Sequence, residues 1–355
     1  MNANERGALW QRLAEAGLVT GATPAPAGDG TVWYIRAMLG AAAWIAAVFL
    51  LAFIGMALHD LVRTNVAKIV TGLVVCAGAA VMLRVATGPF AGQLALALSL
   101  TGQALFAFGM LNLFDRGRLQ VAPAMFVVAA VEALLVIAVP NVVHRVICTI
   151  AAALALAYGL WSAGLGTLGL PLAAAAFVVV ELDEARLARW PRLYPAIGIG
   201  LALAIAAILP VQAAGDEWSF WRTRDRDLFF GPRFADAAMG AVFFGAAPWL
   251  LAKAGVARGT SPYVAAIAGA LALALVSVGV PGLSAALLIL LIGFATSQRL
   301  LTGLGTLALL AALARFYYAL SATLLVKSAV LLAAAVALLL FWAVLRHAGK
   351  ENDHA

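Results

Sequence analysis

The stretch from Ala311 to His347 most constrains what this chain can fold into, because it has the composition of a transmembrane helix. A lead-in that contains Arg315, Tyr317 and Tyr318 precedes a long apolar run, which ends in a basic exit. A helix needs about 20 apolar residues to cross the hydrocarbon core of a bilayer, and aromatic and basic residues mark its two interfaces. One cation, Lys327, interrupts the apolar run from within.

Similar apolar runs recur along the whole chain. Of its 355 residues, 65% are hydrophobic and only 11% are charged, whereas soluble domains carry about 25% charged residues. This number of charged residues is too small to cover a globular surface in water. Lipid must therefore be the solvent for most of the chain. The runs are uninterrupted and rich in Ala, Leu and Val, unlike the short alternating strands of a barrel. We therefore predict an all-α fold, a polytopic transmembrane helix bundle of about twelve spans.

The predicted spans follow one another with short loops between most of them. They are 37–58, 67–83, 90–111, 120–139, 142–160, 163–180, 196–213, 236–252, 262–280, 282–298, 300–314 and 311–347. Three of them are at the short end for a span, and we expect these to be tilted or to pair as re-entrant elements: 163–180, 236–252 and 282–298.

The predicted domain organisation is a leader, a bundle and a tail. The leader holds a short amphipathic helix in GALWQRLAEAGLV, before a Pro/Gly-rich linker. The charged connector at 181–195 divides the bundle into two possible halves. The predicted boundaries are 1–36 for the leader, 37–346 for the bundle, 37–180 and 196–346 for its halves, and 347–355 for the cytoplasmic tail.

The distribution of basic residues predicts the orientation. With twelve spans and a cytoplasmic N-terminus, thirteen Lys/Arg fall on the cytoplasmic side and nine outside. Four of those nine lie in the loop at 215–234, where four acidic residues offset them. Basic residues concentrate in cytoplasmic loops, so we expect a bacterial inner-membrane protein with both termini in the cytoplasm. The net charge of +7 fits headgroup contacts. No basic run with interleaved aromatics is present, so we expect the lipid bilayer as partner and no nucleic acid.

Glu132 is the sharpest candidate for function. It lies well inside the segment 120–139, where a carboxylate costs roughly 2.5–3.5 kcal/mol and marks a functional site by default. The alternative is a structural role, in which a buried and protonated Glu132 bonds to a neighbouring helix.

Lys327 is the second intramembrane candidate. Its stem could reach the interface, which would make it structural. By elimination, Glu132 is its expected acidic partner, because we find no other Asp or Glu deep inside a predicted segment.

The remaining polar candidates fit structural roles first. Arg315, Tyr317 and Tyr318 have the composition of an interfacial belt, and Gln103 is typical of helix–helix hydrogen bonding. Cys76 and Cys148 are interpreted as small hydrophobic residues, and the four histidines are scattered. We expect no cofactor, no metal site and no enzymatic activity, because no catalytic constellation is visible.

The segments at the two ends resemble a known family. They are GLGTLALLAALARFYYALSATLLVKSAVLLAAAVALLL, VPGLSAALLILLIGFA before it, LWQRLAEAGLV near the start and WYIRAMLG at the entry to the first span. They are similar to an uncharacterised bacterial family of multi-pass inner-membrane proteins, a domain of unknown function. Such proteins are often encoded beside other membrane proteins, including a family named for a GDYxxLxY motif, which is absent here. The resemblance implies a membrane location and fold, with no known activity and no established site residues.

Two functions remain open from the sequence. The first is a non-catalytic accessory or scaffold subunit, which would assemble with other membrane proteins through small-residue helix faces. The alternative is a secondary transporter or carrier that uses Glu132 as an intramembrane proton or substrate site. A lipid-acting enzyme is the weakest reading, because clustered His, Asp or Ser residues on the outer face are lacking.

Reporter fusions test the predicted topology. A reporter fused after Asp225 is expected to be extracytoplasmic and one fused after Lys350 cytoplasmic, because of the Lys/Arg bias. Activities of alkaline phosphatase and green fluorescent protein fusions give the two readings. A fusion after Arg258, which is predicted to be cytoplasmic, serves as an internal control. An extracytoplasmic C-terminus would contradict the arrangement of twelve spans with both ends inside.

Overall fold

The computed structural model describes residues 3–21, 63–85, 88–114, 118–183, 193–213, 232–278 and 280–319, with isolated residues between 38 and 56 and residues 325 and 328. The described residues form helices and no strand, which confirms the predicted all-α class for this part of the chain. Most of the first predicted span, most of the last one and nearly all of the loop 215–234 lie outside the described residues.

The chain divides into two compact units. Unit 1 comprises Met1–Asp60 and Val75–Thr101, and unit 2 comprises Leu61–Val74 and Gly102–Ala355. The described part of unit 1 holds α1 (Ala3–Glu15), where the leader helix was predicted, and the adjoining parts of α3 (Asn65–Val85) and α4 (Pro89–Leu113). Within this unit the Cys76 thiol donates to the Ser99 carbonyl oxygen at 3.6 Å, which ties α3 to α4.

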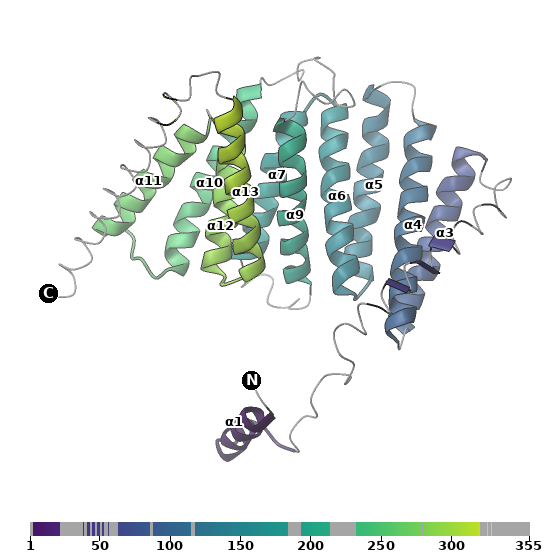
Figure 1. Ribbon diagram of the computed structural model, residues 1–355, viewed down its shortest axis with the longest axis horizontal. Coiled ribbons are helices and arrows are strands. Elements are labelled where there is room, and N and C mark those ends of the chain that lie inside the picture. The colour runs from purple at the N-terminus through teal and green to yellow at the C-terminus, as the bar shows by residue number, and fades with distance from the viewer. Residues whose placement is uncertain are drawn as a thin grey trace. The chain divides into compact units, whose positions relative to one another are not determined.

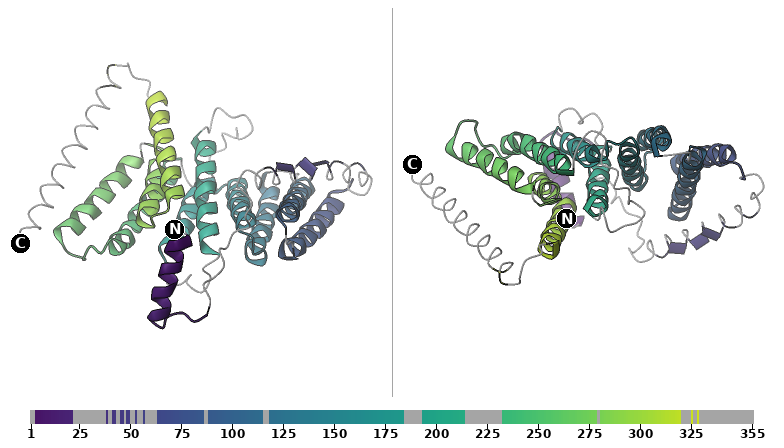
Figure 2. Two further views of the ribbon diagram at one scale, coloured as in Figure 1. Left: turned by 60° about the horizontal axis from the view of Figure 1, so that its bottom comes forward. Right: turned by 90° about the horizontal axis from the view of Figure 1, so that it is seen from above.

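Unit 2 holds the remaining parts of α3 and α4 and every later helix (Figure 1). These helices are α5 (Arg118–Ala138), α6 (Val142–Ser162), η1 (Gly166–Leu168), α7 (Gly169–Leu182), α9 (Tyr194–Ala213), α10 (Pro232–Lys253), α11 (Ser261–Ser277), α12 (Leu283–Ala295) and α13 (Arg299–Ala319). In unit 2, α6 packs between α5 and α9, α7 packs between α9 and α10, and α12 and α13 form a hairpin, as the further views also show (Figure 2).

Each predicted segment from 67–83 to 300–314 corresponds to one α-helix, with η1 leading into α7. Six helices in the described part of the chain are long and apolar enough to cross a membrane, which indicates a membrane protein. They are α3, α4, α5, α6, α10 and α13. Four further apolar helices are shorter, so the prediction of about twelve spans is not confirmed.

The expected short segments at 163–180 and 282–298 are indeed short helices, but the one at 236–252 is not. Helix α10 begins at Pro232 and has 22 residues. The sequence-based boundary was wrong because it excluded Arg233 as a loop residue, whereas proline readily opens a helix at its first position. Helix α12 has 13 residues, about 20 Å of rise, which is less than the roughly 30 Å of a hydrocarbon core.

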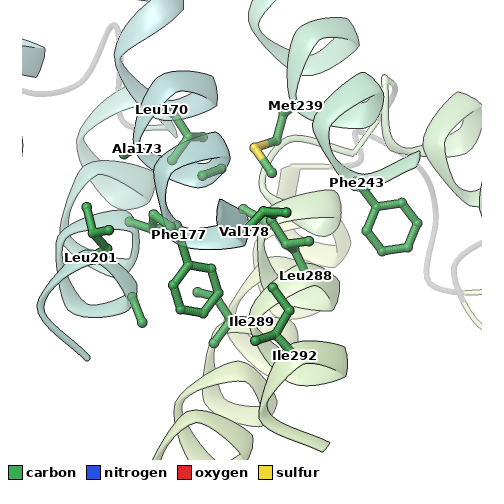
Figure 3. Packing of buried hydrophobic residues seen from close by; sticks show 14 of the residues in the cluster. Leu170, Ala173, Phe177, Val178, Leu201, Met239, Phe243, Leu288, Ile289 and Ile292 are labelled. Atoms are coloured by element: carbon green, nitrogen blue, oxygen red, sulfur yellow. The ribbon is translucent and has the colours of Figure 1, made fainter. Parts of the chain in front are cut away.

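The core of unit 2 is built from apolar side chains of α7, α9, α10, α12 and α13. Phe177, Ile205, Leu288, Ile289 and Ile292 are fully buried in it. Figure 3 shows Phe177 and Val178 of α7 facing Leu288, Ile289 and Ile292 of α12. The short helix α12 therefore lies in the middle of the core even though its length does not reach across a bilayer.

Helices of this protein approach one another at glycines. A methyl group at Gly72 would lie 2.6 Å from the Phe106 nitrogen of α4, and one at Gly305 would lie 2.5 Å from the Leu290 nitrogen of α12. Such contacts require glycine because any side chain would collide with the neighbouring backbone. Close approach through small residues is the usual basis of helix packing in lipid.

Four helices end in the same hydrogen-bonded turn. In α1, α6 and α10 the residue after the C-cap is a glycine with positive φ, namely Gly17, Gly164 and Gly255. In α12 that residue is Ser297, with φ of 55°, although the two defining bonds are formed: Gln298 N to Gly293 O at 2.9 Å and Ser297 N to Phe294 O at 3.1 Å. A left-handed conformation strains a non-glycine residue at the turn between α12 and α13.

Replacing Ser297 by glycine tests this strain. Ser297→Gly is expected to relieve the left-handed strain and so raise the free energy of unfolding by about 1 kcal/mol. The greater conformational entropy of glycine in the unfolded chain offsets part of this gain. Gly255→Ser, at the matched position after α10, is expected to destabilise it by a similar amount. Thermal unfolding in one detergent measures both. A loss of stability in Ser297→Gly would show that the serine side chain has a role beyond its conformation.

Candidate functional site

A buried polar cluster lies within unit 2, where α4, α5 and α6 meet. It consists of Gln103 on α4, Glu132 on α5, and His144 and Cys148 on α6. Glu132 is 2% exposed, and His144 and Cys148 are fully buried. Leu134 of α5, two residues from Glu132, is in contrast 65% exposed. Polar groups inside and apolar side chains outside are what a lipid-embedded bundle requires.

Cys148 is the centre of the cluster. The Gln103 Nε2 group donates to its sulfur at 3.3 Å, and His144 Nδ1 lies 3.5 Å from the same atom. The thiol also forms a hydrogen bond with the Glu132 carboxylate. Gln103 Nε2 and His144 Nε2 are 3.4 Å apart, which closes the network. The cluster thus connects three helices through one sulfur atom.

One carboxylate oxygen of Glu132 stands outside this network. Glu132 Oε2 is buried and has no hydrogen-bond partner among the described residues. Buried polar atoms are nearly always paired, and an exception calls for an explanation. The site therefore holds one acceptor that a proton or a ligand group could still occupy.

The start of α6 is fixed by its own polar contacts. The Asn141 side chain caps the helix by accepting from the His144 backbone nitrogen at 3.0 Å. Arg145 Nε donates to the Val136 carbonyl oxygen at 3.1 Å, which supplies a partner to one of the last carbonyls of α5. These bonds fix the start of α6. His144 and Cys148 are four residues apart on this helix, so their side chains lie on the same face.

A second buried carboxylate lies on α7. Glu181 is 1% exposed, and the Gln298 Nε2 group, in the turn before α13, donates to its Oε2 at 2.8 Å. Our prediction placed Glu181 in the connector, one residue beyond the segment 163–180, whereas the structure buries it in the last turn of α7. Burial at a helix end was not considered when Lys327 was paired with Glu132 by elimination. Lys327 itself lies outside the described residues, and the pairing stays a prediction.

Helix α9 contacts both Glu181 of α7 and α6, the helix that carries His144 and Cys148. A methyl group at Gly198 would overlap Glu181 Oε1, and one at Gly200 would lie 2.6 Å from Thr149 Cβ on α6. We call this set the polar layer: Gln103, Glu132, His144, Cys148, Thr149, Glu181 and Gln298. Two glycines of α9 thus let this helix approach both the Glu181 side chain and α6 closely.

The other predicted site residues do not join the polar layer. Arg315, Tyr317 and Tyr318 lie near the end of α13, about 25 Å along the helix from Gln298. Arg315 interacts electrostatically with Asp236 near the start of α10. The rings of Tyr317 and Tyr318 meet edge to face, with centroids 5.5 Å apart. Of the predicted residues that the structure describes, Gln103 and Glu132 come together in the cluster, through Cys148.

Sequence reasoning missed His144, Cys148, Glu181 and Gln298. The spacing of His144 and Cys148 was an available signal, because residues four apart share a helix face. No signal along the chain connects Glu181 with Gln298, which is 117 residues away. Among the described residues, no group of three or more His, Cys, Asp or Glu side chains is arranged to hold a metal ion.

Comparison with known proteins identifies the family. The domain of unknown function DUF4401 matches residues 32–347. The chain belongs to the DUF4401 family. That match covers the predicted bundle and confirms the resemblance to an uncharacterised domain family. No curated protein and no solved structure matches the chain. The DUF4401 assignment brings no activity with it, so the polar layer is the basis for functional inference.

Alanine at Gly200 tests whether close packing of α9 holds the polar layer together. Gly200→Ala is expected to destabilise the protein by roughly 1–3 kcal/mol, because the added methyl group would collide with Thr149. Gly245→Ala on α10 is the matched control, since nothing described lies within 4 Å of that position. Thermal unfolding in lipid nanodiscs provides the comparison. Equal stability of the two variants would rule out a tight contact between α9 and α6.

Proposed function

We propose that this protein is a proton-coupled secondary transporter in which the Glu132 carboxyl group binds and releases the coupling proton. The single observation that carries the proposal is the buried Glu132 Oε2, an acceptor with no partner among the described residues. A carboxyl group kept in lipid for structure alone would be expected to have both oxygens paired. Acidic and histidine side chains inside membrane spans commonly form proton relays.

The neighbours of Glu132 fit this role. The Cys148 thiol donates to the carboxylate, and the His144 imidazole lies against the same thiol at 3.5 Å. Both side chains can exchange protons, so a proton could move within the cluster over short steps. Gln103 would hold the sulfur in place from α4 at 3.3 Å. In this proposal Glu132 is the proton site, and Gln103 positions its partner.

The proposal includes the finer features of the predicted topology. It places the protein in a bacterial inner membrane, with twelve spans and both termini in the cytoplasm. The polar layer would then lie toward the cytoplasmic side. The protein would catalyse no covalent chemistry, and its immediate partner would be the lipid bilayer.

Purified protein in proteoliposomes tests the transport proposal. Under an imposed pH gradient, candidate substrates grouped as inorganic cations, organic anions and zwitterions are added, and internal pH is followed with pyranine. We expect one class to evoke proton flux in the wild type, loss of that flux in Glu132→Gln, and partial retention in Glu132→Asp. Asp183→Asn, at the half-buried cap of α7, is the control and is expected to behave as wild type.

The second candidate function is an accessory subunit of a membrane complex. It is favoured by α11, where Ala265, Ala268 and Ala272 are exposed and form a small-residue face. Such faces let another helix approach closely in lipid. Purification from native membranes distinguishes the two functions. A stoichiometric membrane partner that is lost on Ala268→Leu, together with no proton flux by the protein alone, would support the subunit and reject the transporter.

A further inference from the structure

The Glu181 carboxylate lies at a junction of four helices in unit 2. It projects from the last turn of α7, against α9, and accepts from Gln298 in the turn between α12 and α13. It is more completely buried than Glu132. Burying a carboxylate is costly unless it is hydrogen-bonded or neutralised. The bond from Gln298 therefore helps an ionised Glu181 to stay at this junction.

Helix α9 provides the room for this carboxylate. Gly198 is buried, and a methyl group there would overlap Glu181 Oε1. The next small residue on α9, Gly200, lies against Thr149 and the Val146 carbonyl oxygen of α6. Helix α9 therefore contacts Glu181 through one glycine and the helix of His144 and Cys148 through the other. A displacement of Glu181 would act directly on the helix that adjoins the first cluster.

Gln298 is held by its backbone. Its N–H donates to Gly293 at 2.9 Å, and its carbonyl oxygen accepts from Thr302 N at 3.0 Å. Ser297 before it has the left-handed conformation that serine adopts only under constraint. The side chain of Gln298 is thus presented toward α7 by a strained turn, and its amide joins the α12–α13 hairpin to Glu181.

We propose that Glu181 is a second proton-binding residue and that its protonation releases the turn between α12 and α13, which carries Gln298, from the end of α7. This inference rests on the proposed transport function, to which it adds the element that moves. An amide N–H donates more strongly to an ionised carboxylate than to a neutral carboxyl group. A proton on Glu181 Oε2 therefore weakens the bond that Gln298 Nε2 donates to that oxygen.

The opening is confined to the turn before α13. Helix α12 itself stays packed, because its Leu288, Ile289 and Ile292 side chains are buried in the core of unit 2. Among the residues that the structure describes, each element around Glu181 except α12 has a charged or titratable group near this end of unit 2. They are Asp183 at the C-cap of α7, His144 and Arg145 on α6, Tyr194 on α9, Lys253 on α10 and Arg299 on α13. Because these groups could also respond to pH, the test uses variants that change Glu181 or Gln298 alone.

Carbodiimide labelling and hydrogen exchange test the inference without a known substrate. Dicyclohexylcarbodiimide adds to a protonated carboxyl group in apolar surroundings, and the product is located by mass spectrometry. We expect the full-length protein in nanodiscs to be labelled at Glu181 more strongly as the pH falls. Exchange of the amides at 297–302, corrected for intrinsic rates, is expected to rise about tenfold over the same range, the factor typical of losing one charge-assisted hydrogen bond.

Three variants make the test specific. Glu181→Gln and Gln298→Leu are both expected to give fast exchange at 297–302 at every pH, because each removes the charge-assisted bond. Asp183→Asn is expected to keep the pH dependence of the wild type. If one variant of the pair fails to fold, the other still gives the result. Exchange that does not depend on pH in the wild type, or no labelling of Glu181 at any pH, would overturn the inference.

The outcomes for the two proposals can be told apart. If Glu132→Gln abolishes proton flux while Glu181 is inert to carbodiimide, the transport function stands and the second proton site is rejected. If no substrate class evokes flux while exchange at 297–302 still depends on Glu181, the transport function is rejected. The proposal that protonation of Glu181 opens the turn before α13 then stands.

Discussion

Apolar side chains cover the outside of this bundle, and every other feature of the structure depends on that constraint. Leu307 of α13 is 67% exposed, and Leu134 and Leu275 are similarly exposed. In lipid, helices gain nothing by hiding such side chains from water, so their association relies on van der Waals contact at close range. Glycines allow this close contact. Gly72 lies against the backbone of α4, Gly305 against the backbone of α12, and Gly200 against α6.

The polar layer follows from the same constraint. Since lipid offers no hydrogen bonds, polar side chains must find partners inside the bundle. Glu132 does so through Cys148, and Glu181 through Gln298. Each carboxylate is thereby joined to a different helix pair, and α9 lies between the two groups because it has glycines at 198 and 200. The arrangement gives two groups of exchangeable side chains inside unit 2, with α9 in contact with Glu181 and with the helix of His144 and Cys148.

The α12–α13 hairpin departs most from a simple bundle of spanning helices. Helix α12 is too short to cross a bilayer, yet its Leu288, Ile289 and Ile292 are among the most buried residues of the chain. The residue after its C-cap is Ser297, whereas α1, α6 and α10 have glycine at the corresponding position. The strain is tolerated because the turn makes both of its defining hydrogen bonds and places Gln298 beside Glu181.

The sequence by itself determined the helical class, the positions of the described helices within a few residues and the family resemblance, and it singled out Glu132 as an acid inside a helix. These follow from local hydrophobicity and from the cost of one charge in lipid, both of which are readable along the chain. Only the tertiary structure decided that Cys148 joins Glu132 to Gln103 and His144, that α10 is a long helix, and that Glu181 is a buried acid. Those facts depend on which helix faces meet, and helices in lipid are matched by glycine positions rather than by any periodic apolar pattern. Glu181 and Gln298 meet for that reason, across 117 residues of sequence.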